Sequence, residues 1–439
     1  MRVVCMLALV LLIAIPPASC GIPGTAAPTP TPIIIIASPT PGAAPTAPAI
    51  QPPLAPTSSP STTPAASPLP TEAATVSPQV TAPAASAPQL QLSQATLIGI
   101  FRGAITSWDD AHIQTDNPGV ALPKLPIRVL YRSDPSGTTR AITEYFVDVD
   151  EWWKANIGAA YRLGDAGSKP WPVGQGTNDS SQLAKAVKAT PGAIGYVAPS
   201  YAQSEQLPLA ILSNAAGNWV SPSPSTLNEA ATNTVGNLDR RLRGFIVNAS
   251  GPNAYPLAIY TWMLSCPQGF RVEQGQALAD FLYWAITDPQ AAAAARQLGY
   301  EPIPTVIRDQ AIAELTTLKI DNQPIFAAPA TGQTFKPRHF ESPIVLSGSG
   351  GTFPNPLYQE LIKRYQQVEP SVMLTYNAAG STQGRVDLLQ AGIVQFAGSD
   401  EAVVDGDAQI TRAVCLPAPL HIPMVVGAVG IVYNLPPSS

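Results

Sequence analysis

The sequence is poor in the side chains that most enzymes use at their active sites. It contains only three histidines, His112, His339 and His421, and their positions do not have the spacing of metal ligands. The G-x-S-x-G signature of a nucleophilic serine is also missing, and no Ser/His/Asp arrangement can be recognised. We therefore expect a protein that is not an enzyme, with no catalytic residue, no metal and no other cofactor. The histidines are interpreted as ordinary surface or core residues.

Charged side chains are scarce as well. Only 12% of the residues are Asp, Glu, Lys or Arg, the formal net charge is −5, and the Lys and Arg residues form no cluster. A protein that binds nucleic acid needs a basic face, so we exclude this class of partner. A net negative charge does not prevent an acidic protein from binding an anion, provided that the donors are local and mostly uncharged.

Cysteine is rare, and its positions indicate export. An apolar run, Val3–Ile15, follows one early Arg; it is too short to span a bilayer comfortably and is typical of a secretory signal. Small residues immediately before Cys20 resemble a bacterial lipobox, in which the Cys is lipidated. We expect residues 1–20 to be a lipoprotein signal peptide, with Cys20 anchoring the exported protein to the outer face of the cell membrane. The alternative is an ordinary signal peptide that is cleaved nearby.

Two further cysteines remain in the exported part of the chain. Cys266 and Cys415 could form a disulfide there, because the environment outside the cell permits it. The alternative is two buried free thiols.

Proline, by contrast, is abundant and unevenly distributed. The chain has 49 prolines, and residues 21–90 consist mainly of Ala, Pro, Thr and Ser with almost no charge. Prolines every few residues prevent a helix or a sheet from propagating. This composition predicts an extended, disordered stalk over residues 21–90.

From residue 91 the composition becomes that of a globular protein, in which strands alternate with helices. Strands are expected at Ile127–Tyr131, Gly192–Val197 and Ala254–Leu264, and a helix at Tyr145–Ala155. This alternation predicts an α/β fold whose sheet is covered on both faces.

Three turns of small residues each follow an apolar strand and begin a helical pattern. They are Arg132–Arg140, Ser347–Pro354 and Asn377–Thr382. The first turn of a helix has N–H groups without intrahelical partners and the positive end of the helix dipole. Each turn is therefore a candidate anion site, and Arg132 at the end of its strand could add charged donors. If the three turns converge, they would bury an oxyanion.

Taken together, these motifs resemble a known family, the phosphate-binding proteins of bacterial high-affinity ABC phosphate importers. The matching segments are Ile105–Asp110, Arg132–Thr138, Gly192–Val197, Gly348–Pro354, Gly380–Thr382 and Phe396–Asp400. The resemblance implies a type II periplasmic-binding-protein-like fold, in which two α/β lobes are joined by a hinge and close around phosphate. We expect residues 91–255, with the Arg-Ser-Gly-Thr turn, to form one lobe, and residues 256–437 the second, with a linker at about 321–343.

The resemblance also implies which residues bind phosphate. They are Thr352, Phe353, Ser381, Asp400, Arg132, Ser136, Gly137 and Thr138, and Asp134 stands where the family pairs an Asp with the Arg. Without the family match, Asp400 would be interpreted as the cap of a helix that follows it. With the match, the resemblance implies that Asp400 accepts a hydrogen bond from the proton that phosphate carries. Sulfate has no such proton, and we expect Asp400 to reject it.

The order of the motifs differs from that of the family. The segment from Ile344 to Leu435 matches the first third of the family pattern, and it stands here at the end. We expect a circularly permuted chain, in which 321–343 joins the old ends and one crossing between the lobes remains, near Tyr255–Tyr260. The alternative is a tandem gene with a lobe-deleted first copy and a truncated second copy.

The function that the resemblance implies is an extracytoplasmic, lipid-anchored receptor that delivers inorganic phosphate to the membrane permease of an ABC importer, and we expect a monomer. One alternative is a phosphate sensor or surface scaffold that does not transport, and another is a binder of a different oxyanion. A phosphatase on the same fold is disfavoured, because no nucleophile–base pair is visible.

Overall fold

The computed structural model describes residues 89–165, 168–320, 322–330, 332–407 and 409–436. The expected signal peptide, Cys20 and nearly all of the expected stalk lie outside the described residues. At the boundary, the prediction of a stalk up to residue 90 is wrong. Leu90 is fully buried, and its N–H donates to the Tyr433 hydroxyl at 3.0 Å. The described residues belong to one compact unit.

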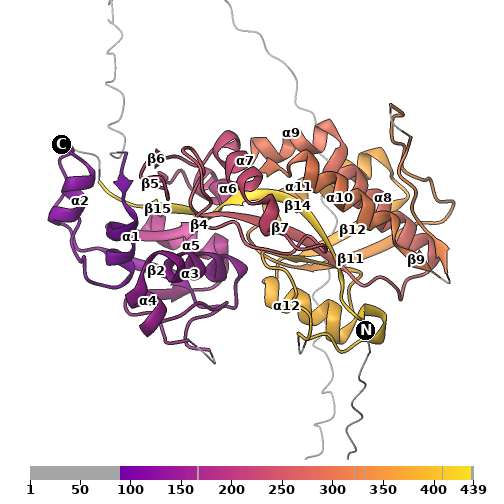
Figure 1. The fold of residues 1–439 in the computed structure, drawn as a ribbon, viewed down its shortest axis with the longest axis horizontal. Coiled ribbons are helices and arrows are strands. Elements are labelled where there is room, and N and C mark those ends of the chain that lie inside the picture. The colour runs from indigo at the N-terminus through magenta and orange to yellow at the C-terminus, as the bar shows by residue number, and fades with distance from the viewer. Residues whose placement is uncertain (1–88, 166–167, 321, 331, 408, 437–439) are drawn as a thin grey trace, which may run out of the picture. The chain divides into compact units, whose positions relative to one another are not determined.

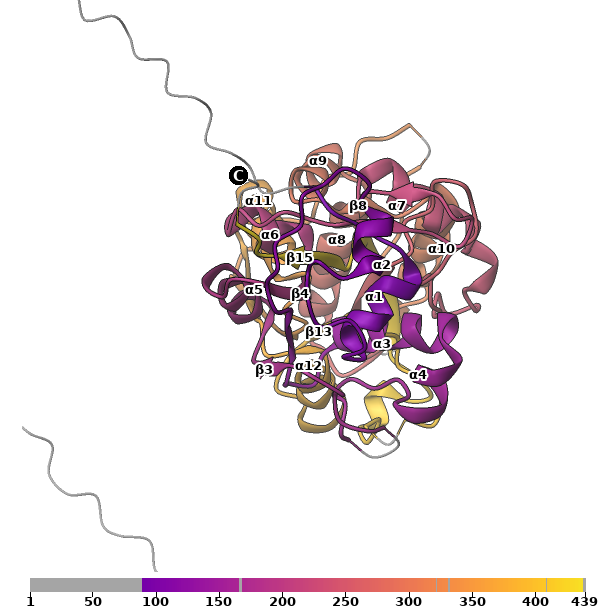
Figure 2. The same ribbon diagram turned by 90° about the vertical axis from the view of Figure 1, so that its left-hand side faces the viewer.

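The first lobe contains a four-stranded mixed sheet. Its strands, in spatial order, are β15 (Gly430–Tyr433), β4 (Ala193–Val197), β2 (Arg128–Arg132) and β3 (Gln175–Thr177). Helix α5 (Ser180–Ala189) packs on one face. Aromatic side chains of α1 (Gln94–Phe101) and α3 (Gly137–Val149) meet those of β4 on the other. Figure 2 looks onto this lobe, with α1 and α3 toward the viewer. The predicted strands at 127–131 and 192–197 are thus confirmed as β2 and β4.

The second lobe contains a six-stranded mixed sheet. Its strands, in spatial order, are β12 (Val372–Asn377), β11 (Ile344–Gly350), β13 (Phe396–Ser399), β7 (Ala258–Ser265), β14 (Leu420–Ala428) and β8 (Glu301–Pro302). The helices of this lobe are α8 (Val272–Thr287), α9 (Pro289–Gln297), α10 (Thr305–Thr316), α11 (Asn355–Val368) and α12 (Ser381–Val386), with a π-helix at Asp387–Ala391. The predicted α/β fold class is confirmed.

Further elements lie around these two sheets, besides 3-10 helices at Val235–Asn237 and Ala413–Cys415. They are the helices α2 (Ala111–Asp116), α4 (Glu151–Asn156), α6 (Pro199–Ser204) and α7 (Pro224–Asn233), the three-stranded sheet β1 (Gln91–Leu92), β5 (Ile211–Ser213) and β6 (Trp219–Val220), and the two-stranded β9 (Lys319–Ile320) and β10 (Gln323–Pro324).

The chain passes between the two sheets twice, at adjacent places. It leaves the first lobe just before β7 and returns at Val429, between β14 and β15, as the yellow strand in Figure 1 shows. The Val429 N–H donates to the Leu257 carbonyl at 2.8 Å, and the Tyr255 hydroxyl donates to the Val429 carbonyl at 3.2 Å. The expectation of a single crossing is wrong, because β15 pairs with β4. The expected second lobe, 256–437, therefore loses its last strand to the first.

The helix expected at Tyr145–Ala155 is interrupted. Asp150 has an extended backbone, and its carboxylate accepts the Trp153 N–H at 2.5 Å, which caps α4. The segment is therefore the end of α3 followed by the separate helix α4. An Asp at this position ends one helix and begins the next.

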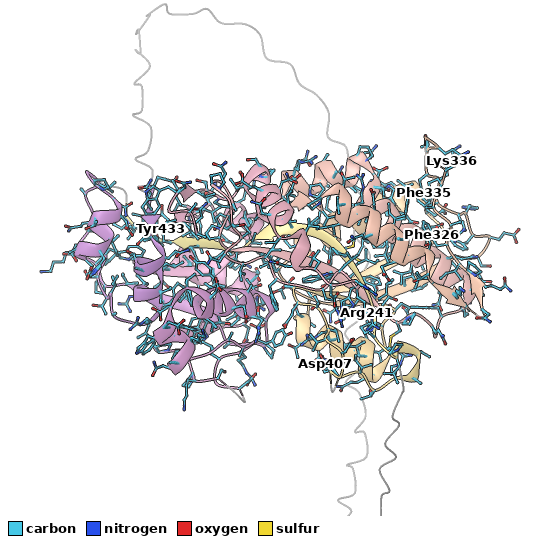
Figure 3. All side chains as sticks on the ribbon, in the orientation of Figure 1. Arg241, Phe326, Phe335, Lys336, Asp407 and Tyr433 are labelled. Carbon is cyan, nitrogen blue, oxygen red and sulfur yellow. A yellow bond between two sulfur atoms is a disulfide. The ribbon has the colours of Figure 1, made fainter. Side chains whose placement is uncertain are left out.

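Described residues of the segment expected to be a linker, 321–343, pack onto the second lobe. The rings of Phe326 and Phe335 lie 5.2 and 4.6 Å from that of Tyr283 on α8, and Figure 3 shows both Phe side chains at this end of the lobe. The Arg338 N–H donates to the buried Asp280 carboxylate at 2.8 Å. The segment therefore has fixed contacts with α8, which we did not expect of a linker.

Cys266 and Cys415 form a disulfide in the structure. It joins the end of β7 to the segment that precedes β14, over a sequence separation of 149 residues.

Candidate anion-binding site between the two lobes

The first lobe contributes the start of α3 to the site. Ser136 is the N-cap residue of this helix, and its hydroxyl accepts the Thr139 N–H at 3.3 Å. Gly137 and Thr138 form the first turn, and all of these residues are buried. Because the first N–H groups of a helix have no intrahelical acceptor, this turn can donate to an anion.

Arg132, at the end of β2, is buried and already bound to two side chains. Its Nε donates to Asp134 at 2.6 Å, its Nη2 contacts the other oxygen of the same carboxylate, and its Nη1 donates to the Ser180 hydroxyl at 2.9 Å. Burial opposes the charged form of Arg132, but Asp134 outweighs it and raises the pKa of the guanidinium. Arg132 therefore stays charged in a fixed orientation.

Arg132 is connected to the second lobe through Ser180, which contacts Thr352. The hydroxyls of Ser180 and Thr352 lie 3.0 Å apart, and Tyr201 donates to the Thr352 carbonyl at 2.6 Å. Ser180 begins α5 of the first lobe, whereas Thr352 follows β11 of the second. The two lobes thus touch at the site, which corresponds to a closed arrangement.

Asp400 lies directly against the α3 turn. It follows β13, and its side chain packs beside Gly137 of the other lobe, where a Cβ would lie 2.5 Å from Asp400 Cβ. Ser381 holds the residue in place: its hydroxyl accepts the Asp400 N–H at 3.3 Å and donates to Oδ2 at 3.4 Å. The interpretation of Asp400 as a helix cap is wrong, because no helix begins within the described residues 401–407.

The electrostatics of Asp400 are unusual for a carboxylate. Burial raises its pKa to about 7, although Arg132 and the Ser381 hydroxyl both favour the charged form. Its Oδ1 atom is buried and has no hydrogen-bond partner. A buried acceptor without a partner is uncommon, so Oδ1 is suited to a donor from a bound molecule.

Three buried hydroxyl oxygens in the small-residue turns also lack partners. They belong to Thr138, Ser349 and Thr382. Thr138 was expected at the site; Ser349 and Thr382 were not, although both lie in the small-residue turns that indicated it. Ser180 was missed too, and its only signal in the sequence was its position at the start of a helix.

Phe353 contributes differently from the other expected residues. Its ring is fully buried and packs edge-on against Tyr300 at 5.8 Å between centroids. Its carbonyl accepts the Tyr300 hydroxyl at 2.7 Å. The ring therefore belongs to the core, and only the backbone of Phe353 can face a ligand.

Within the described residues, no group of three or more His, Cys, Asp and Glu side chains could hold a metal ion. No helix in the same part of the chain is long and apolar enough to cross a membrane.

Comparisons with known proteins point to one family. The model of the PBP superfamily domain matches residues 72–289. The phosphate-binding protein PstS of Pasteurella multocida is 34% identical over 240 residues, which are 55% of this chain and 67% of the relative. PstS of Xylella fastidiosa is 34% identical over 216 residues, 49% of this chain and 57% of the relative. The chain thus spans little more than half the length of that relative.

One match is a solved structure. A phosphate-binding protein of a phosphate ABC transporter from Streptococcus pneumoniae is matched over 70% of this chain and 88% of its own, with 15% identity and a TM-score of 0.39.

Proposed function

Because the chain belongs to the PstS family of phosphate-binding proteins, within the PBP superfamily, we propose that it binds inorganic phosphate between its two lobes. The observation that carries the proposal is the group of buried oxygens without partners at this site, those of Thr138, Ser349, Thr382 and Asp400. Thr138 lies in the turn of the first lobe that follows Arg132. The other three residues follow or end strands of the second lobe. A bound phosphate that keeps a proton would supply the missing partners, because its oxygens accept from the hydroxyls and its P–OH group donates to Asp400.

The proposed contacts come from both lobes. They are Arg132, Ser136, Gly137 and Thr138 from the first lobe, and Thr352, the backbone of Phe353, Ser381 and Asp400 from the second. Asp134 orients Arg132 through the hydrogen bonds between their side chains. The site binds its ligand without transforming it, since none of these residues forms a nucleophile–base pair.

The ionised carboxylate of Asp400 would select phosphate over sulfate. A carboxylate only accepts hydrogen bonds, and phosphate near neutral pH carries a proton to donate, whereas sulfate carries none. Sulfate would therefore place two negative groups face to face in a dry site, and a mismatch of this kind can reject an analogue by about 10⁴-fold.

Isothermal titration of the purified protein with phosphate, sulfate and arsenate tests this function. We expect phosphate to bind and sulfate to bind negligibly. Binding of sulfate as tightly as phosphate would contradict the assignment and would favour a less selective oxyanion receptor.

The cellular role is a further part of the proposal. The protein would be an exported, monomeric lipoprotein, anchored through Cys20, that delivers phosphate to the permease of an ABC importer. Changing Cys20→Ala should release the protein from the membrane fraction. The alternative role, a sensor or scaffold, predicts normal phosphate uptake in cells without the protein, whereas delivery predicts a loss of uptake.

Circular permutation is also proposed. One observation supports it: Leu90 is hydrogen-bonded to Tyr433, so the ends of the described fold are neighbours. A variant that joins residue 436 to residue 89 and opens within 327–334 should fold and bind phosphate. A dimer in solution that exchanges its last strand would instead favour a broken tandem gene.

A further inference from the structure

Arg385 is a buried arginine one helical turn beyond Ser381. It lies on α12, and only 3% of its surface is exposed. Four residues after Ser381, it lies on the same side of the helix, about 6 Å further along. Its Nη1 donates to the Tyr161 hydroxyl at 2.6 Å, and its guanidinium stands 4.5 Å from the centroid of the Tyr161 ring. Its Nε has no partner.

Within the described residues, no acidic side chain forms an ion pair or a hydrogen bond with Arg385; Asp407 acts on it only as a nearby negative charge. In the part of the chain that the structure describes, the only hydrogen bond of its side chain goes to a neutral tyrosine. Asp387, two residues further on, instead accepts a hydrogen bond from Gln383 at 2.7 Å. Burial lowers the pKa of Arg385, and the nearby charge of Asp407 offsets this effect only in part. A buried charge without an ion-pair partner is unfavourable, so Arg385 is only partly neutralised in the ligand-free protein.

The other charges at the site do not favour an anion. Arg132 is balanced by Asp134, and Arg140 by Glu144 at 2.7 Å. Asp400 adds a negative charge whenever it is ionised. Two further carboxyl groups lie nearby: Asp407 acts on Arg385, and burial raises the pKa of Glu401 to about 8. Arg385 therefore offsets negative charge that would otherwise oppose the entry of phosphate.

The contact between Arg385 and Tyr161 also connects the lobes. Tyr161 lies in the first lobe, and its carbonyl accepts the N–H of Ser136, the N-cap residue of α3. Arg385 lies in the second lobe, on the helix that Ser381 begins. Their hydrogen bond therefore joins the segments that carry Ser136 and Ser381, and lobe opening would break it.

We propose that Arg385 is the second cation of this site: it latches onto Tyr161 when the lobes close and supplies the positive charge that a phosphate anion needs. It acts as a positioning and charge-balancing residue and does not contact the ligand. This inference rests on the proposed function.

The test compares four variants with the wild type by isothermal titration with phosphate and by thermal unfolding without phosphate. Arg385→Met removes the charge with little change in volume, Arg385→Lys keeps it, and Tyr161→Phe keeps the ring but loses the hydrogen bond. Arg308→Gln, on α10, removes a partly exposed positive charge elsewhere in the second lobe and is the matched control.

Arg385→Met should weaken phosphate binding about tenfold or more, because a charge is lost in a site of low dielectric constant. Its ligand-free melting temperature should be unchanged or higher, since an unpaired buried charge is removed. Arg385→Lys should recover most of the affinity, Tyr161→Phe should lose several-fold, and Arg308→Gln should match the wild type.

Two results would overturn the inference and leave phosphate binding intact. One is an unchanged affinity in Arg385→Met. The other is a parallel fall of affinity and ligand-free stability in that variant with no recovery in Arg385→Lys, which would indicate a structural role only. A wild type that does not bind phosphate would overturn both the inference and the proposed function.

Discussion

Gly137 and Asp400 approach each other so closely across the two lobes that a side-chain carbon on Gly137 would lie 2.5 Å from Asp400 Cβ. Gly137 and Asp400 are both buried, so neither residue can move away freely. Glycine is required at position 137 because a side chain would collide with Asp400. Its backbone conformation is one that other residues can also adopt. The consequence is that the lobes can close only while position 137 has no side chain.

We therefore expect Gly137→Ala to weaken phosphate binding by about 5- to 150-fold, because a methyl group keeps the lobes apart and costs on the order of 1–3 kcal/mol in overpacking. Isothermal titration measures the effect. Gly236→Ala is the control, since a Cβ there meets no atom within 4 Å. Equal affinities of the two variants would contradict closure at this contact.

The Asp400→Asn variant should lose its discrimination between phosphate and sulfate. The amide of Asn can donate to either anion, so the ratio of the two dissociation constants should fall by several orders of magnitude, from about 10⁴ toward one. Arg132→Ala should instead weaken the binding of phosphate and of sulfate by the same factor. An unchanged ratio in Asp400→Asn would show that another group selects the ligand.

The stability of the phosphate-free protein should depend on pH through Asp400. Its pKa is about 7 in the folded protein, above the ordinary value of 3.8, so the folded state holds a proton that the unfolded state has released. The stabilisation is fully present below about pH 4 and is lost as the pH rises through about 7.

Asp400→Asn does not titrate at this position, so its free energy of unfolding should rise relative to that of the wild type by on the order of 3 kcal/mol between about pH 4 and about pH 8. Urea unfolding of both proteins without phosphate gives this difference. The titrations of Glu401 and His421 occur in both proteins and cancel. A difference that is constant over the pH range would mean that the Asp400 pKa is not raised.

The disulfide should stabilise the protein strongly. Replacing Cys266 and Cys415 by Ser is expected to lower the free energy of unfolding by about 3–5 kcal/mol, because the bond closes a long loop in the unfolded chain. Denaturation with urea measures the change, and the single Cys266→Ser variant controls for the local loss of a buried sulfur. A change below about 1 kcal/mol would mean that the loop is already restricted in the unfolded state.

Local sequence was sufficient for the parts of the fold that depend on neighbours in the chain. The strand that ends at Arg132 and the helix that Ser136 caps were predictable, because an apolar run, a hydroxyl residue and a glycine determine such a unit locally. The interruption at Asp150 was equally local, and its signal, an Asp between two helical patterns, was overlooked.

Other features depend on distant pairing. Val429–Leu435 is apolar and suits either sheet, and only its hydrogen bonds with β4 determine that it returns to the first lobe. In the same way, nothing near Ser180 in the sequence indicates that its hydroxyl meets Thr352, 172 residues away. The packing of Phe335 onto Tyr283 likewise requires the three-dimensional arrangement.

The return of the last strand has a practical meaning for anyone who would use the protein as an optical sensor. Leu90 and Tyr433 are hydrogen-bonded to each other, and β15 is part of the sheet of the first lobe. Fluorophores at positions 89 and 434 would therefore both be attached to the first lobe. Their separation would stay constant when the second lobe moves. A dye on α4 paired with a dye on α10 would span both crossings. Energy transfer between dyes on α4 and α10 would change when the lobes rotate relative to each other. Energy transfer between dyes at positions 89 and 434 would not.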